Sequence, residues 1–204
     1  MRGERPLLRF ALTVLALLPA SFVAWYFFGA FAAAPAVLIA KPVLTSWLPE
    51  LIDTVYLQGT DLMVMSTLGE VDGQFMSAAA AGNQLGYPID TRILSYSLPF
   101  FCALFFATPR DGGWSELAWS IIALWLLMAV GLIATALKNL MLGLGTRFLD
   151  SSGVPPSDAI ALTYQFSTLM VPTLAPVLLW AYTSRDSDAF RALLPAALRT
   201  ELNP

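Results

Sequence analysis

Four long apolar runs, in which charged residues are scarce, constrain the fold of this 204-residue chain more than any other feature. A hydrocarbon core about 30 Å thick needs roughly 20 apolar residues per helix. The runs therefore predict membrane-spanning helices at residues 7–30, 92–108, 117–137 and 160–182. Apolar residues make up 57% of the chain and charged residues 12%, a balance that excludes an ordinary soluble domain.

The distribution of charge predicts the orientation of these helices. Arginines 2, 5 and 9 precede the first run and arginines 185, 191 and 199 follow the last, whereas residues 41–90 hold one lysine and six acidic residues. Because basic residues stay on the cytoplasmic side, we expect both termini in the cytoplasm and an extracytoplasmic lobe at residues 41–91. Lys138 and Arg147 depart from this rule, since the loop that holds them is expected outside.

The first apolar run admits two interpretations. The small residues of AFAAAPA, residues 30–36, resemble a signal-peptide cleavage site, and cleavage would leave three spans. The run before them is longer than the 7 to 15 apolar residues usual for a signal peptide. An anchor helix with a break marked by Gly29 and Pro35 is the favoured interpretation.

The expected lobe combines a helix with a hairpin. Apolar residues recur at helical spacing between Leu44 and Val55, which predicts a helix along the membrane surface or against the bundle. Strand-forming residues follow from Leu62, and Asp72-Gly73 predicts a tight turn. The predicted fold class is an all-α integral membrane protein with a small α+β extracytoplasmic lobe between the first two spans, forming a single domain over residues 1–204.

The residue inventory excludes several kinds of chemistry. The chain has no histidine, so Ser-His-Asp and Cys-His catalysis and histidine-ligated metals are unavailable. Its single cysteine, Cys102, lies among apolar residues of the second span with no group to activate it. No basic run suits a nucleic acid. We therefore expect no enzyme, no cofactor, no metal site and no nucleic-acid partner.

Two predicted spans carry polar and proline residues at helical spacing. Each proline removes a backbone donor, and hydrocarbon cannot satisfy the carbonyl that is freed, so these faces must meet protein or water. One interpretation is packing between the chain's own helices, and the other is docking of a membrane partner or its substrate. A transport path is disfavoured because the deep parts of the spans lack carboxylates and bases. The candidate partner-binding residues are Arg92, Ser95, Tyr96, Pro99, Tyr164, Gln165, Thr168, Pro172 and Pro176.

Arg92 stands at the outer mouth of the second predicted span, next to Asp90. A structural role would place its guanidinium at the lipid headgroups or against Asp90. A binding role would use its fixed fork of donors to hold a carboxylate or a phosphate.

Two segments resemble a known family. They are DTRILSYSLPFFCALFFATP, residues 90–109, and AIALTYQFSTLMVPTLAPVLLW, residues 159–180. They are similar to the exosortase H-associated membrane proteins, small bacterial inner-membrane proteins recognised with a dedicated exosortase. An exosortase is a transpeptidase-like membrane enzyme that processes C-terminal sorting tails. YQF followed by two spaced prolines is the most specific part of the resemblance, which covers about forty residues by motif.

The resemblance implies an accessory role beside the exosortase in the bacterial inner membrane. The chain lacks the Cys, Arg and His set of the exosortases themselves, so it is not the transpeptidase. We expect a non-enzymatic accessory protein that contacts lipid and binds an exosortase or its sorting substrate. The alternatives are an assembly or structural subunit of another envelope complex and, less favoured, a small transporter subunit.

Overall fold

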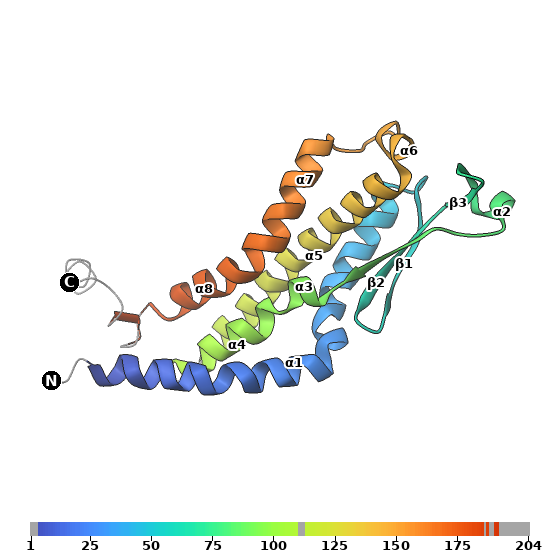
Figure 1. Cartoon of the computed structure of the whole chain (residues 1–204). Helices are drawn as coiled ribbons and strands as arrows, with labels where there is room; N and C mark the ends of the chain where they lie inside the picture. The colour runs from blue at the N-terminus through green and yellow to red at the C-terminus, as the bar shows by residue number, and fades with distance from the viewer. Residues whose placement is uncertain (1–3, 110–112, 186, 188–189, 192–204) are drawn as a thin grey trace. The chain divides into compact units, whose positions relative to one another are not determined.

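The computed structural model describes residues 4–109, 113–185, 187 and 190–191, and helices dominate it (Figure 1). The longer helices are α1 (Glu4–Trp47), α4 (Ser97–Ala107), α5 (Trp114–Leu144), α7 (Ser157–Gln165) and α8 (Val171–Thr183). The short helices are α2 (Ala78–Ala81), α3 (Arg92–Ser95) and α6 (Thr146–Leu149), and a π-helix, η1 (Phe166–Met170), joins α7 to α8.

Three helical segments of the described chain are long and apolar enough to cross a membrane. They are Leu7–Trp47, Trp114–Leu144 and Ser157–Thr183, which contain the first, third and fourth predicted spans. The second predicted span corresponds to a shorter apolar stretch, Arg92–Ala107, made of α3 and α4. The chain is therefore a membrane protein by the length and composition of its helices.

The backbone divides into two compact units. The first unit comprises Met1–Phe28, Tyr96–Leu124 and Thr173–Pro204, and the second comprises Gly29–Ser95 and Trp125–Pro172. One boundary coincides with Phe28, where φ of −108° and ψ of 16° interrupt the helical geometry of α1. The predicted break is therefore found next to Gly29, whereas Pro35 lies within the helix that follows.

The first unit has an aromatic and apolar interior. Buried side chains of α4, including Phe101 and Phe105, form part of it. The ring of Trp180 stacks on Phe10 with centroids 5.2 Å apart, and its indole Nε1–H donates to Thr108 Oγ1 at 2.8 Å. This interior ties the beginning of α1 to α4 and α8 through side chains that are far apart in sequence.

The second unit is built around a three-stranded antiparallel sheet in the order β1-β2-β5. Its strands are β1 (Ile52–Gln58), β2 (Asp61–Ser66) and β5 (Gly86–Asp90). Alternate residues of β2 are buried, as expected for a strand with one face on the core. One continuous apolar cluster joins this face to the second part of α1 and to α5.

The predicted surface helix between Leu44 and Val55 is wrong in its second half. Helix α1 ends at Trp47, and Ile52–Gln58 forms β1, which pairs with β2. Apart from Trp47, which is exposed, the apolar residues at helical spacing are nevertheless buried, because α1 ends on the same core that β1 then covers. β-branched residues and pairing with β2 override the helical pattern across the turn at Pro49.

The predicted turn at Asp72-Gly73 is present. It joins β3 (Leu68–Val71) to β4 (Gln74–Ser77), and both turn residues have positive φ, 51° and 78°. Positive φ at both positions is the geometry of a two-residue hairpin turn that favours Asp-Gly. The residues from Leu62 to Ser66 belong instead to the other sheet, between β1 and β5.

Candidate functional site

The last candidate span turns its predicted proline and polar stripe toward protein. By contrast, the side chains of Leu162 and Leu169 on its other side are 66% and 72% exposed. In this stripe Thr168, Pro172 and Pro176 are buried, and Tyr164 is half-buried. The backbone beside the two prolines therefore lies on a protein-facing side, where polar groups can be satisfied.

A π-helix precedes Pro172. The N–H of Val171 donates to the carbonyl of Phe166, five residues earlier, in place of the α-helical partner four residues earlier. Pro172 has no N–H and therefore cannot donate a hydrogen bond to the carbonyl of Thr168. The hydroxyl of Thr168 donates to the carbonyl of Tyr164 at 2.7 Å. The wider turn and the proline occur together, as is common where helices bend.

Apart from Arg92, which is exposed, the candidate residues of the second span also face protein. Ser95 is fully buried at the end of α3, and Pro99 is buried in α4. Within the second unit α3 contacts the π-helix. Within the first unit the hydroxyls of Tyr96 and Thr173 form a hydrogen bond of 3.0 Å. The second and last apolar segments thus contact each other in each unit, and Thr173 is a partner that the predicted stripes did not include.

Gln165 differs from the other candidates of the last span because its side chain is exposed. It is the last residue of α7, and the exposed side chains of Leu162, Phe166 and Leu169 surround it on the helix surface. Its amide forms no hydrogen bond with the residues that the structure describes. This amide is a donor and acceptor presented outward from an apolar helix.

Arg92 holds the turn between β1 and β2. Its Nε and Nη2 donate to Thr60 Oγ1 at 3.1 Å and 2.8 Å, and its backbone N–H donates to Asp90 Oδ1 at 2.9 Å. Arg92 Nε also lies 3.9 Å from Asp90 Oδ1, and both side chains are nearly half exposed. An exposed ion pair of this length contributes little, so the contact with Thr60 is the stronger one.

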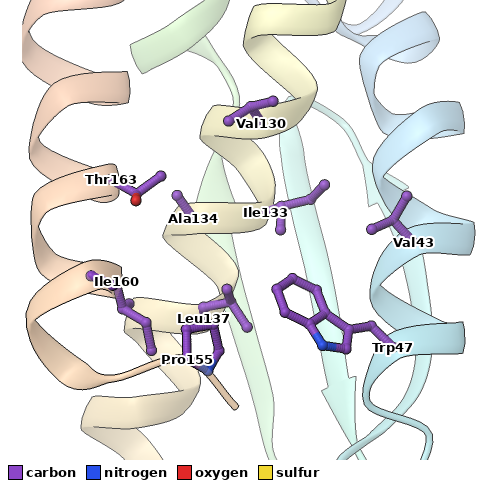
Figure 2. Close-up of a pocket in the computed structure, with 10 residues that line it drawn as sticks. Val43, Trp47, Val130, Ile133, Ala134, Leu137, Pro155, Ile160 and Thr163 are labelled. Atoms are coloured by element: carbon purple, nitrogen blue, oxygen red, sulfur yellow. The ribbon is translucent and has the colours of Figure 1, made fainter. Parts of the chain in front are cut away.

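An open apolar groove of about 250 Å³ lies between α1, α5 and α7 (Figure 2). All of its lining belongs to the second unit. Figure 2 shows the α7 side chains on one flank, those of α5 at the back, and Val43 and Trp47 of α1 on the other flank. Sequence reasoning did not find the groove, since the wall from α1 lies more than 80 residues before the walls from α5 and α7. The lining residues are Val43, Trp47, Val130, Ile133, Ala134, Leu137, Pro155, Ala159, Ile160 and Thr163.

A cation lies beside this groove. The ammonium of Lys138 is 4.6 Å from the centre of the Tyr164 ring, a distance at which a cation and an aromatic face attract each other. Tyr164 was a candidate from sequence, whereas Lys138 entered only as a departure from the charge rule. The contact gives Lys138 a fixed position at the junction of α5 and α7.

The titratable groups of the described residues offer few chemical options. No three histidine, cysteine, aspartate or glutamate side chains among the residues described gather closely enough to hold a metal ion. Burial raises the pKa of Tyr87 in β5, and the negative charge of Glu70 raises it further. A phenol with a raised pKa is a poor general acid or base near neutral pH. The groups described above are instead suited to packing and hydrogen bonding.

Comparison with known proteins identifies a family. A family model described as exosortase H-associated membrane protein matches residues 4–187. No curated protein and no solved structure matches the chain. The family match covers both segments that carry the resemblance in the sequence, together with the lobe and the first helix. Because the match extends over most of its length, the chain belongs to the exosortase H-associated membrane protein family.

Proposed function

We propose that this chain is a non-enzymatic accessory protein that docks onto an exosortase within the bacterial inner membrane and assists the processing of proteins with C-terminal sorting tails. The family match supports the association with an exosortase H. The absence of histidine from the sequence supports a role without catalysis of its own.

The observation that carries the docking proposal is the outward amide of Gln165. At 1.5 Å per residue, Gln165 lies roughly 12 Å along the helix from Ser157, inside the candidate span Ser157–Thr183. The amide has no hydrogen-bond partner among the described residues. Leaving a polar group unpaired in an apolar medium costs several kcal/mol by transfer measurements, about 2 to 7. A polar group on a second membrane protein would remove this penalty.

The other candidate residues are proposed to stabilise the chain's own fold and not to contact the partner. Thr168 bonds to Tyr164 and Tyr96 bonds to Thr173 within the chain, so these polar groups are already satisfied. We therefore centre the docking face on Gln165, with exposed Leu162, Phe166 and Leu169 around it. Apolar side chains around a single polar group are a common composition for contacts between membrane helices.

The test is co-purification from native membranes. A tagged wild-type chain and the Gln165→Leu variant are extracted in mild detergent, and the exosortase that accompanies each is quantified by mass spectrometry. Loss of one interhelical hydrogen bond predicts a decrease of about threefold to tenfold in the recovered exosortase. Because Gln165 is exposed, the variant should fold and insert normally.

Thr13→Val is the matched control. Thr13 is exposed on α1, and its hydroxyl donates to the carbonyl of Arg9 at 2.8 Å, so its removal exposes no unpaired group to a partner. The control should retain the exosortase at the wild-type level. Equal recovery with Gln165→Leu would contradict this docking face. Recovery of a different envelope complex by the wild-type chain would favour the assembly-subunit alternative.

The proposed topology has four spans with both termini in the cytoplasm. Arg92–Ala107 would be the remaining span, and its 16 residues reach roughly 24 Å as a helix, slightly less than a typical hydrocarbon core. Residues 41–91 would then lie outside. Single cysteines introduced at Ser152 and Ser115 of a Cys102→Ala chain test this arrangement. An impermeant thiol reagent applied to intact spheroplasts should label the first and not the second, and the opposite pattern would refute the orientation.

A further inference from the structure

The interior of the groove between α1, α5 and α7 is almost entirely apolar. Among its lining residues the polar groups are the indole N–H of Trp47 and the hydroxyl of Thr163. The indole N–H already donates to the carbonyl of Gly153 at 3.1 Å. A polar ligand would lose its hydrogen bonds to water and gain almost none, so the groove suits an apolar occupant.

The size of the groove restricts that occupant. A helix about 10 Å in diameter, and as long as the part of α5 from Val130 to Leu137, would occupy roughly 800 Å³. The groove holds about 250 Å³. It is therefore too small for a whole helix, whereas an extended hydrocarbon chain is narrow enough to enter. Val130 and Val43, which line the groove, are both exposed, so the groove is open to the surrounding lipid.

Lys138 continues the row of side chains that lines the groove. Val130 and Ala134 line it at a spacing of four residues, and Lys138 follows four residues later on the same face of α5. The third predicted membrane span ends at Leu137, so the ammonium belongs at the depth of the lipid headgroups. An acyl chain in the groove would place its headgroup next to this cation.

The ammonium of Lys138 can bind an anion. It is held over the ring of Tyr164, and no carboxylate among the residues that the structure describes forms an ion pair with it. A lysine ammonium carries three N–H donors, and a phosphate offers several charged acceptor oxygens. A lysine ammonium without a carboxylate partner in the described part of the chain, beside an apolar groove, is complementary in charge and polarity to an anionic phospholipid.

From these observations we infer that the groove holds one acyl chain of an anionic phospholipid and that Lys138 binds the lipid's phosphate. The bound chain fills the space between α1, α5 and α7 and makes the lipid part of the second unit's packing. This site does not depend on the proposed docking of an exosortase at Gln165, which lies outside the groove lining. Failure of either proposal leaves the other intact.

Native mass spectrometry of the full chain tests the site. The protein is reconstituted into bilayers of equimolar phosphatidylglycerol and phosphatidylcholine, extracted into mild detergent, and examined for retained lipid. The wild-type chain should retain phosphatidylglycerol in preference to phosphatidylcholine. Ala159→Leu places a larger side chain in the groove from an exposed position, so it should fold normally. Its retained lipid should fall about tenfold, the equivalent of roughly two buried methylene groups.

The headgroup contact is tested separately. Lys138→Gln should still retain lipid but should lose the preference for phosphatidylglycerol. Two matched controls, Ala118→Leu and Lys41→Gln, alter an exposed alanine of α5 and an exposed lysine of α1 outside the groove lining. Both controls should behave like the wild type. The inference is overturned if Ala159→Leu retains as much lipid as the wild type, or if Lys41→Gln abolishes the preference as fully as Lys138→Gln.

Discussion

The guanidinium of Arg92 donates two hydrogen bonds, of 3.1 Å and 2.8 Å, to the hydroxyl oxygen of Thr60. Thr60 lies in the turn between β1 and β2, and Arg92 begins α3 directly after β5. The hydroxyl of Thr91 adds a third bond, to the carbonyl of Thr60 at 2.7 Å. The tip of the hairpin is therefore fastened to the point where the chain enters its second apolar helix.

Replacing Thr60 with valine should loosen this attachment. The substitution keeps the side-chain shape but removes the acceptor for Arg92, which costs roughly 1 kcal/mol because the guanidinium is partly exposed to water. Hydrogen exchange followed by mass spectrometry should show amides near residues 58–61 exchanging about fivefold faster. Thr60→Ser, which retains the hydroxyl, should exchange like the wild type. Unchanged protection in Thr60→Val would show that the carbonyl contact with Thr91 is sufficient.

Replacing Thr108 with valine should destabilise the first unit. Trp180 and Thr108 are both buried, and the substitution leaves the indole N–H without its acceptor. An unpaired buried donor costs about 1 to 3 kcal/mol, which should lower the thermal midpoint of the purified protein in detergent. In a Trp180→Phe background the donor is already absent, so Thr108→Val should cost less there than in the wild type. An equal cost in both backgrounds would contradict this account.

Replacing Gly69 with alanine should disrupt the junction of β3 with α2. A Cβ at this buried position would collide with the backbone and side-chain oxygens of Asn83 and with the Cβ of Ala81. Asn83 is fixed by two hydrogen bonds with the backbone of Glu70, so it cannot retreat easily. We expect a loss of about 1 to 3 kcal/mol, seen as faster proteolysis within residues 68–83.

Gly29→Ala is the control for that variant. A Cβ at Gly29 would meet only the methyl group of Thr60, at an ordinary contact distance of 3.6 Å. Alanine also favours the helical backbone over glycine by about 1 kcal/mol. The control should therefore leave proteolysis unchanged or slow it. If both variants are cleaved equally fast, crowding at Asn83 is not the cause.

Tyr87 should make the stability of the lobe depend on pH under alkaline conditions. Burial, reinforced by Glu70, raises the pKa of this phenol, so the folded state holds the proton more tightly than the unfolded state. Below the ordinary tyrosine pKa of about 10, both states are protonated and stability is unaffected. As the pH rises through that value, the unfolded state loses its proton first, and the folded state becomes less stable.

The contribution of Tyr87 is measured as the difference between the wild type and Tyr87→Phe in hydrogen-exchange protection of β5 from pH 8 to pH 11. The wild type should lose more protection than the variant as the pH rises. Glu70→Gln should reduce the difference, because it removes the second cause of the raised pKa. Identical pH profiles for the wild type and Tyr87→Phe would refute the assignment.

The sequence by itself determined the membrane class, the positions of the apolar helices, the Asp72-Gly73 turn and the family. These features depend on local composition and on residues close together in the chain, since apolar length and turn chemistry act over a few turns of backbone. The interruption of α1 was also predictable to within one residue of Gly29. Local apolar spacing likewise predicted a buried face between Leu44 and Val55, although it did not predict the strand in the second half of that segment.

Only the tertiary structure decided what that backbone is and what the candidate residues touch. Residues 52–58 became a strand because β2 offered pairing partners, a choice that no helical spacing could reveal. The tertiary structure satisfied Thr168 and Tyr96 within the chain and left the amide of Gln165 facing outward. It also brought α1, α5 and α7 together around the apolar groove. Contacts of this kind join segments distant in sequence, and their geometry is fixed by packing of the whole unit.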